Sequence, residues 1–326
     1  MNLPTIQKNY NTKAKCIRHL EKVRWNGTPE CPHCESTNVT PRKKRPFFYH
    51  CNNCNRDFTV LFGTIFEASK LPLTKWFTLI SMMLNARKGI SSKQISRDIH
   101  VTYKTAWFSA MRVRCAMLDQ ADMLEGIVEM DEAYIGGKPR MRYNQAGLSK
   151  LTIRREKPKR GRGTSKIPVV GIVERDGRVV TKIQEELNSQ EMLKLLKRYV
   201  RLDRTIVMTD EARFYNKFDN VIQHLSVNHG KKEYVKDGII HTNTIEGFWS
   251  IVKNGIRGQY HVLSKKYLPF YLAEFAYKYN RRHKEQAAKA FDDTITNAVM
   301  DEKCSVNYKP KAYPRFLAYR RKKKKA

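Results

Sequence analysis

The stretch "HTNTIEGFWSIVKNG", residues 241–255, separates into two faces when it is read at helical spacing. Its bulky apolar residues, with Ile256 just beyond it, follow the i, i+3, i+4, i+7, i+11 spacing of a helix stripe that faces a core: Ile245, Phe248, Trp249, Val252 and Ile256. The opposite face carries polar side chains: Asn243, Glu246, Ser250, Lys253 and Arg257. A solvated surface is the plain explanation of such a face. We expect instead a functional carboxylate and lysine, because of what the rest of the chain contains.

The balance of charge is the dominant feature of the composition. The 326 residues include 63 Lys and Arg against 31 Asp and Glu, which leaves a net charge of +32. Such an excess repels itself unless it meets a polyanion, and nucleic acid is the usual one. An anionic membrane surface is the alternative. No apolar run approaches the roughly 20 residues that a spanning helix needs. Met1 is followed by polar residues rather than by a secretory signal, so we expect a cytoplasmic protein with no membrane partner.

Four of the seven cysteines form two closely spaced pairs, "CPHC" (31–34) and "CNNC" (51–54). Two such pairs brought together give the tetrahedral cage of four thiolates that zinc favours. Two disulfides are the alternative, but a reducing cytosol disfavours them. We therefore predict one structural Zn²⁺ in a zinc ribbon, with strands in 41–50 and 56–66. Its ligands would be Cys31, Cys34, Cys51 and Cys54, and they would leave no open position for chemistry.

Residues 71–120 have the pattern of a helix-turn-helix. A first helix is predicted from about 74 to 87, a short one over 92–99 after Ser91 or Ser92, and a third over 103–114 after Thr102. In this motif the last helix enters the major groove of DNA. The residues at its groove-facing start would be Tyr103, Lys104 and Thr105. A plain three-helix packing unit is the alternative.

The rest of the chain alternates strands and helices. A strand over 126–137 carries Asp131 near its middle, and a later buried strand ends at Asp210. A hairpin turns at Asp176-Gly177, and Ser189 is predicted to cap a helix. Residues 138–166 hold eleven Lys or Arg and a single acid. The end of that segment, which includes Arg160 and Arg162, is predicted to contact the DNA backbone.

Three carboxylates are set apart by their positions: Asp131 on a strand, Asp210 at a strand end, and Glu246 on a helix after 35 intervening residues. This arrangement resembles the D, D-35-E pattern of transposases and retroviral integrases. Lys253 matches the lysine that follows the acid in many insertion-sequence transposases. Four further motifs are similar to bacterial insertion-sequence transposases with an N-terminal zinc ribbon: "MDEAYIGGK", "TDEARFY", "HTNTIEGFWSIVKNGIRGQYH" and "YLAEFAYKYNRR".

The resemblance implies a multidomain chain whose catalytic part has an α/β RNase H-like, retroviral-integrase-like fold. We expect an N-terminal helix and zinc ribbon in 1–70, a helix-turn-helix DNA-binding domain in 71–120, the catalytic domain in 125–285 and a basic C-terminal tail in 286–326. The implied activity is binding of terminal inverted repeats, followed by metal-dependent strand cleavage and strand transfer. Its partners would be double-stranded transposon ends and target DNA, bound by a homodimer or larger assembly in the bacterial cytoplasm, with the nucleoid.

The site itself would hold two Mg²⁺ or Mn²⁺ ions. Three converging carboxylates repel one another unless a cation neutralises them, and hard divalent ions take carboxylate oxygen. Some related transposases carry Asn as the third ligand, so both Asn243 and Glu246 are candidates. Glu129 shares the strand face of Asp131 and would be either a supporting group or a salt-bridged surface acid, whereas Glu132 should point away. The alternatives to a transposase are a nuclease of the same fold without strand transfer and a domesticated DNA-binding regulator.

Overall fold

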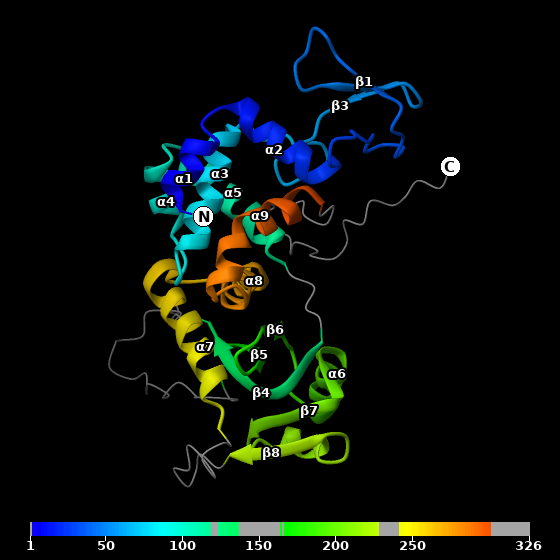
Figure 1. Ribbon diagram of the computed structural model, residues 1–326. Helices are drawn as coiled ribbons and strands as arrows, with labels where there is room; N and C mark the ends of the chain where they lie inside the picture. Colours follow the sequence, from blue (N-terminus) through cyan, green and yellow to red (C-terminus); the bar gives the residue numbers. More distant parts are fainter. Residues whose placement is uncertain (1, 119–122, 137–163, 165, 228–240, 301–326) are drawn as a thin grey trace, which may run out of the picture. The chain divides into compact units, whose positions relative to one another are not determined.

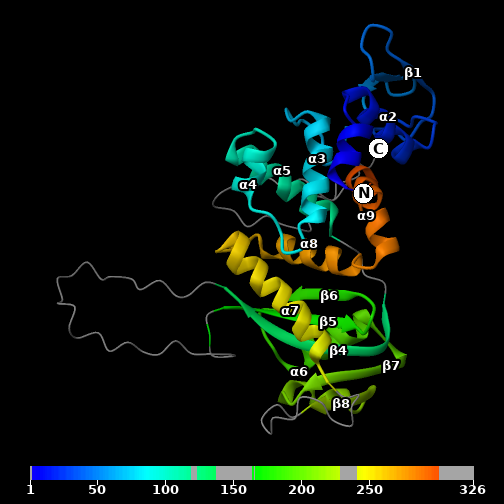
Figure 2. The same ribbon diagram turned by 60° about the vertical axis from the view of Figure 1, so that its left-hand side comes forward.

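The computed structural model describes residues 2–118, 123–136, 164, 166–227 and 241–300. The chain divides into two compact units (Figures 1 and 2). The first comprises residues 1–120 together with 270–326, and the second comprises residues 121–269. No helix among the described residues is both long and apolar enough to cross a membrane.

The first unit begins with two helices and a small sheet. Helices α1 (Leu3–Asn9) and α2 (Lys13–Trp25) are each opened by a side-chain cap, from Asn2 and Thr12. Strands β1 (Val39–Pro41), β2 (Tyr49–Cys51) and β3 (Arg56–Phe58) form an antiparallel sheet. These strands are shorter than the sequence predicted, because the basic residues after β1 turn back on themselves, with the Arg45 N–H donating to the Arg42 carbonyl.

Three helices follow close to their predicted positions: α3 (Leu73–Asn85), α4 (Ser92–Asp98) and α5 (Tyr103–Ala116). Ser91 caps α4 and Thr102 caps α5. The tight turn between α4 and α5 places His100 at φ +50°. The Ser96 hydroxyl donates to the Val101 carbonyl at 2.6 Å and holds that turn closed.

Helices α8 (Leu268–Asn280) and α9 (Lys284–Met300) complete the first unit. Tyr277 of α8 and Phe291 of α9 are buried in one core with Phe77 of α3. We expected the catalytic domain to run to residue 285 and a basic tail to begin at 286. The structure differs, since α9 carries apolar residues at helical spacing and buries them: Ala290, Phe291, Ile295, Ala298 and Val299. The rest of the expected tail, 301–326, lies outside the described residues.

The second unit is a mixed α/β fold around a five-stranded sheet. Its strands are β4 (Leu124–Ile135), β5 (Ile167–Glu174), β6 (Val179–Ile183), β7 (Val200–Asp210) and β8 (Gln223–Val227). Their order is β6-β5-β4-β7-β8, in which β4, β5 and β6 are antiparallel neighbours while β7 and β8 run parallel to β4. The hairpin predicted at Asp176-Gly177 joins β5 to β6.

Helices cover both faces of this sheet (Figures 1 and 2). On one face lie α6 (Ser189–Tyr199) and the 3-10 helix η2 (Arg213–Phe218), which pack against Val128 and Met130 of β4. The N-cap of α6 is Asn188 rather than the predicted Ser189, because the Asn188 side chain accepts the Glu191 N–H at 2.9 Å. On the other face lies α7 (Asn243–Gly255), which continues as the π-helix η4 (Ile256–Tyr260).

Candidate metal centres and nucleic-acid contacts

The four paired cysteines meet at the small sheet of the first unit. The Sγ atoms of Cys31 and Cys54 lie 3.6 Å apart, those of Cys34 and Cys51 lie 3.5 Å apart, and all four sulfurs lie within 4.8 Å of one another. A tetrahedron of sulfurs about 2.3 Å from a zinc ion has edges of about 3.8 Å. All four cysteines are free of disulfides, so the cluster fits the predicted zinc ribbon.

The electrostatics of the cluster also call for a cation. Backbone N–H groups of Cys54 and Asn53 donate to the Cys51 sulfur and lower the pKa of Cys51 to about 6. Burial and the neighbouring sulfurs raise the pKa of Cys54 to about 12. The surroundings therefore favour a thiolate at Cys51 but disfavour one at Cys54. A bound dication removes that opposition, because it stabilises every thiolate that contacts it.

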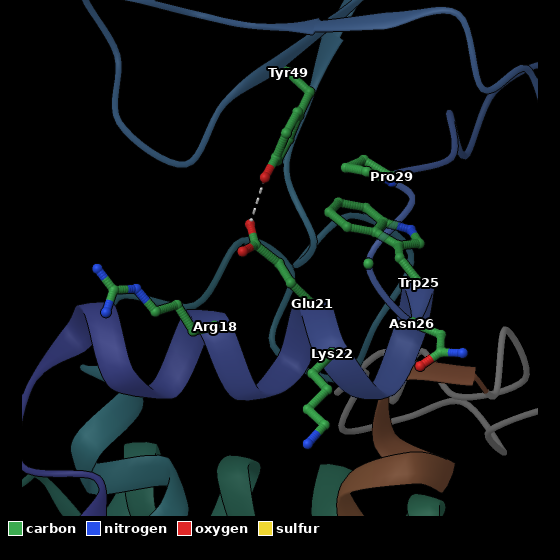
Figure 3. Close-up of a pocket in the computed structure, with 8 residues that line it drawn as sticks. Arg18, Glu21, Lys22, Trp25, Asn26, Pro29 and Tyr49 are labelled. Carbon is green, nitrogen blue, oxygen red and sulfur yellow. Dashed lines mark hydrogen bonds between the residues drawn. The ribbon is translucent and has the colours of Figure 1, made fainter.

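A cavity of about 400 Å³ lies between α2 and the ribbon (Figure 3). Across it the Tyr49 hydroxyl donates to Glu21 Oε1 at 3.1 Å. Burial raises the pKa of Glu21, and burial together with the Glu21 charge raises that of Tyr49 to about 12. Trp25 lines the cavity and packs edge-on against Tyr49. These contacts tie the ribbon to α2, which gives the cavity a structural role.

The second cluster lies where the pairing between the central strands β4 and β7 ends. The parallel register pairs Glu129 of β4 with Met208 of β7. Two residues further along, the two strands carry Asp131 and Asp210. The carboxylates of Asp131, Glu132 and Asp210 each offer an oxygen, and these oxygens lie within 4.8 Å of one another. The Ala212 N–H donates to Asp210 Oδ1 at 3.1 Å and orients that carboxylate.

Glu132 departs from expectation. It was predicted to point away from the cluster, and it does stand on the opposite face of β4 from Asp131. Its longer side chain nevertheless brings a carboxylate oxygen to the two aspartates. The buried Tyr215 of η2 donates its hydroxyl to Glu132 Oε2 at 3.3 Å. Strand periodicity could not reveal this, because side chains of adjacent residues can converge once a strand passes the edge of its neighbour.

The charges around Asp131 join the predicted site residues into one electrostatic system. Burial raises the pKa of Asp131 to about 7, and the charge of Asp210 adds to that rise. The more distant Glu246 also raises the pKa, whereas Lys253 lowers it. The close group of three acids among the described residues contains Glu132 rather than Glu246. Crowded carboxylate oxygens are a fitting donor set for a hard divalent cation, because the cation would relieve the repulsion between them.

Helix α7 has the two faces that the opening stretch predicted. Its apolar stripe is buried, with Ile245, Phe248, Trp249 and Val252 at most 2% exposed. Asn243, Glu246 and Lys253 are exposed on its other side, and Arg257 is exposed in η4. The helix thus presents its carboxylate, amide and cations outward while its apolar side packs on β4 and β5.

Glu129 is fully buried, so the expectation of a surface acid is wrong. Arg175, at the start of the β5–β6 turn, donates from Nε to Glu129 Oε1 at 2.8 Å. The Ile245 N–H of α7 donates to Glu129 Oε2 at 2.9 Å. The sequence signal for this residue was its shared strand face with Asp131, but its partner Arg175 could not be identified from spacing alone.

The predicted DNA contacts lie partly within the described residues. Tyr103 is 54% exposed and Lys104 is also exposed at the start of α5. Thr105 is half-buried, and its hydroxyl hydrogen-bonds that of Thr102 at 2.9 Å. Arg160 and Arg162 lie outside the described residues.

Comparison with known families identifies two matching regions. Residues 123–280 match an ISXO2-like transposase domain, and residues 11–57 match a transposase zinc-ribbon domain. A protein described as "Uncharacterized protein in transposable element ISH50", from Halobacterium salinarum, is 30% identical over 277 residues. The match covers 82% of this chain and 91% of that protein.

Solved structures of a mariner-type transposase are also similar at a low level. The Mos1 paired-end complex with left transposon end is 12% identical, with 68% of this chain and 78% of that chain covered and a TM-score of 0.28. The pre-cleavage Mos1 transpososome is 12% identical, with 93% of this chain and 98% of that chain covered and a TM-score of 0.26. TM-scores this low do not establish a shared fold.

Proposed function

This chain belongs to the ISXO2-like DDE transposases with an N-terminal zinc ribbon, and we propose that it transposes an insertion sequence. In this proposal it binds the terminal inverted repeats, cleaves DNA strands at the ends of the element and joins them to target DNA. The reaction is a metal-dependent phosphoryl transfer.

The observation that carries the proposal is the convergence of Asp131 and Asp210 just beyond the last paired residues of two parallel strands, within electrostatic reach of Glu246 and Lys253. Two Mg²⁺ or Mn²⁺ ions held there would activate the attacking oxygen and stabilise the leaving one in an in-line displacement at phosphorus. A site of this composition serves chemistry on phosphodiesters better than a solvated surface does, because Asp131 and Asp210 are half-buried and repel each other.

The protein groups take separate parts in this reaction. Asp131, Asp210 and Glu246 bind the metal ions as carboxylate ligands, with Asn243 as the alternative to Glu246. Lys253 lies two turns along the exposed face of α7 from Glu246 and binds a DNA phosphate. The Tyr215 hydroxyl holds Glu132 at the rim of the cluster.

The architecture supports the finer parts of the proposal. The sheet order β6-β5-β4-β7-β8, with three antiparallel strands followed by two parallel ones, is consistent with an RNase H-like catalytic domain. The α4–α5 pair and its tight turn support a helix-turn-helix that places Tyr103, Lys104 and Thr105 in the major groove. Arg257, together with Arg160 and Arg162 outside the described residues, would bind phosphates.

The proposed reaction also implies an oligomeric state. Both ends of an element must be held together during transposition, so we propose a homodimer or larger assembly on double-stranded DNA. The expected location with the nucleoid rests on that DNA substrate. The relative from Halobacterium is archaeal, and a bacterial source for this chain stays a prediction.

A plasmid assay tests the function. The protein is incubated with Mg²⁺, a supercoiled donor that carries the element's ends, and a target plasmid. Joined products are expected. Cut products without joining would indicate a nuclease, and binding alone a DNA-binding regulator. Asp210→Asn should abolish all products, whereas Asp203→Asn, which alters a 73% exposed side chain on the same strand β7, should leave them unchanged.

A further inference from the structure

Helix α7 begins without a cap of its own. Its N-cap residue, Thr242, makes no side-chain capping hydrogen bond. The first backbone N–H groups of a helix need acceptors, and a buried one left without a partner is costly. In this helix the Ile245 N–H donates to Glu129 Oε2 at 2.9 Å, from a strand 116 residues earlier in the chain. A carboxylate of the sheet therefore caps α7, and the negative charge suits the positive end of the helix dipole.

Arg175 holds that carboxylate in place. Its Nε donates to Glu129 Oε1 at 2.8 Å, while its Nη2 donates to the His241 carbonyl at 2.9 Å. Its own backbone N–H donates to the Ile127 carbonyl of β4 at 2.9 Å. The guanidinium thus connects the strand, the hairpin corner and the residue before the α7 N-cap. Glu129 is fully buried, and each of its oxygens accepts a hydrogen bond, Oε1 from Arg175 and Oε2 from the Ile245 N–H.

His241 adds a second acceptor at the same helix end. Both the Asn243 N–H, at 3.4 Å, and Arg175 Nη2, at 3.0 Å, donate toward His241 Nδ1. Glu129 Oε1 lies 3.4 Å from the same His241 nitrogen, and the ion pair with Arg175 balances the charge of Glu129.

The middle of α7 is fixed independently at Gly171 of β5. A Cβ at this position would lie 2.6 Å from Trp249 Cζ2 and 2.8 Å from Ile245 Cδ1. Gly171 is also the β5 partner of Asp131 in the sheet register. Glycine lets α7 lie directly on the sheet beside the carboxylate cluster. The hydrogen bond from the Ile245 N–H to Glu129 adds a directional contact at the start of the helix.

We propose that Glu129 is a positioning residue which, braced by Arg175, anchors the N-terminus of α7 and thereby sets the position of Glu246 relative to Asp131. Glu246 directly follows the gripped residue Ile245, and Glu129 lies two residues before Asp131 on the same face of β4. One buried carboxylate therefore sets the distance between ligands on two separate elements. This inference rests on the proposed function, since it assigns Glu246 a part in cleavage.

The anchor is tested first by hydrogen–deuterium exchange in the full chain. In Glu129→Gln the charge that attracts Arg175 and the helix end is lost. We expect amides 243–247 to exchange at least about 10-fold faster, while β4 and β7 keep their protection. The matched control is Glu125→Gln, which alters a half-exposed acid on the same strand, 3.7 Å from Arg201. Unchanged exchange at 243–247 in Glu129→Gln would overturn the proposal. If Glu129→Gln unfolds globally, Arg175→Lys is used in its place. This variant keeps the positive charge but loses the planar guanidinium that bonds Glu129 and His241 together, and amides 243–247 should show the same faster exchange.

The coupling to Glu246 is tested by strand cleavage at saturating Mg²⁺. Glu129→Gln should cut about 10-fold to 100-fold more slowly, the range typical of groups that orient metal ligands, with end binding unchanged. In a Glu246→Gln background, with residual activity measured in Mn²⁺, Glu129→Gln should add less than about 3-fold. If the double variant instead loses the product of the two single-variant rate losses, Glu129 has a general structural role and the proposal is overturned. If the wild type cuts no DNA, the proposed function fails, whereas the exchange experiment still decides on the anchor.

Discussion

At the scale of single residues, the third metal ligand is the most consequential assignment. Glu246 offers a charged carboxylate, whereas Asn243 offers a neutral carbonyl oxygen, a weaker ligand for a hard divalent ion. The charge of Glu246 acts on Asp131. We therefore expect Glu246→Gln to lose several orders of magnitude in cleavage rate, with partial rescue by Mn²⁺. Asn243→Ala should lose about 10-fold to 100-fold.

Cleavage by both variants at saturating Mg²⁺ decides the assignment. Near-normal activity of Glu246→Gln beside an inactive Asn243→Ala would give the ligand role to Asn243. Glu132→Gln belongs in the same series, because its carboxylate lies in the close group of acids. If Glu132→Gln loses as much cleavage activity as Asp210→Asn, Glu132 is a direct metal ligand.

A second residue-scale prediction concerns stability in acid. Glu274 of α8 is fully buried between Arg114 Nε, at 2.7 Å, and Lys278 Nζ, at 2.8 Å. Burial alone would raise its pKa, but the charges of Lys278 and Arg114 outweigh burial and lower the pKa from 4.5 to about 2. A depressed pKa in the folded state means stability that is complete above about pH 4.5 and is lost as the pH falls toward 2.

Glu274→Gln should therefore lower the free energy of unfolding by about 3–5 kcal/mol at pH 7, since it leaves two buried cations short of their partner. The difference between variant and wild type should shrink between pH 4.5 and 2. Urea unfolding of both proteins across this range measures it. A difference that is the same at both ends of the range would contradict the ion-pair explanation.

At the scale of elements, the zinc ribbon depends on its metal. The strands β1, β2 and β3 have three residues each, and the buried core beside them is small. For so small a module, metal binding supplies most of the folding free energy. Cys31→Ser or Cys54→Ser should release zinc and unfold the ribbon. The control is Cys16→Ala, which alters a buried cysteine of α2 outside the cluster and should keep one zinc per chain. One zinc per chain in Cys31→Ser would place the metal elsewhere.

The packing of α7 gives another element-scale prediction. Gly171→Ala places a methyl group against the rigid indole of Trp249, and the helix must move away from the sheet. We expect a loss of about 1–3 kcal/mol in stability, as for other overpacked cores, and slower cleavage with unchanged end binding. Adding Trp249→Phe removes the clashing ring atoms and should recover part of the activity. If Gly171→Ala alone cleaves as fast as the wild type, α7 can shift without affecting cleavage.

At the scale of the whole molecule, the basic segment 138–166 should act as a DNA-binding appendage. It lies almost wholly outside the described residues, but a Cβ added at Gly136 would lie about 3.5 Å from Lys166, the last residue of the segment, so a short linker can replace the residues between these two. The shortened chain should bind all DNA sequences more weakly and show a flatter dependence of affinity on salt, as expected of lost phosphate contacts. A changed sequence preference with an unchanged salt slope would contradict this.

The limits of prediction from sequence follow the range of the interactions. The faces of α7 and the strand positions of Asp131 and Asp210 depend on local periodicity, and the structure confirms them. The burial of Glu129 depends on Arg175, 46 residues away, and the place of α9 depends on a core built from α2, α3 and α5. Such long-range partners leave no mark in the spacing of nearby residues.

The return of α8 and α9 to the first unit has a consequence for synthesis on the ribosome. The chain leaves that unit near residue 120 and comes back at 270, after the whole second unit. Tyr277, Phe291 and Ile295 belong to the core that the first helices began. A nascent chain can complete its second unit while the first still lacks part of its interior. Products of premature termination would therefore expose that unfinished core, which makes them targets for proteolysis rather than competitors for DNA.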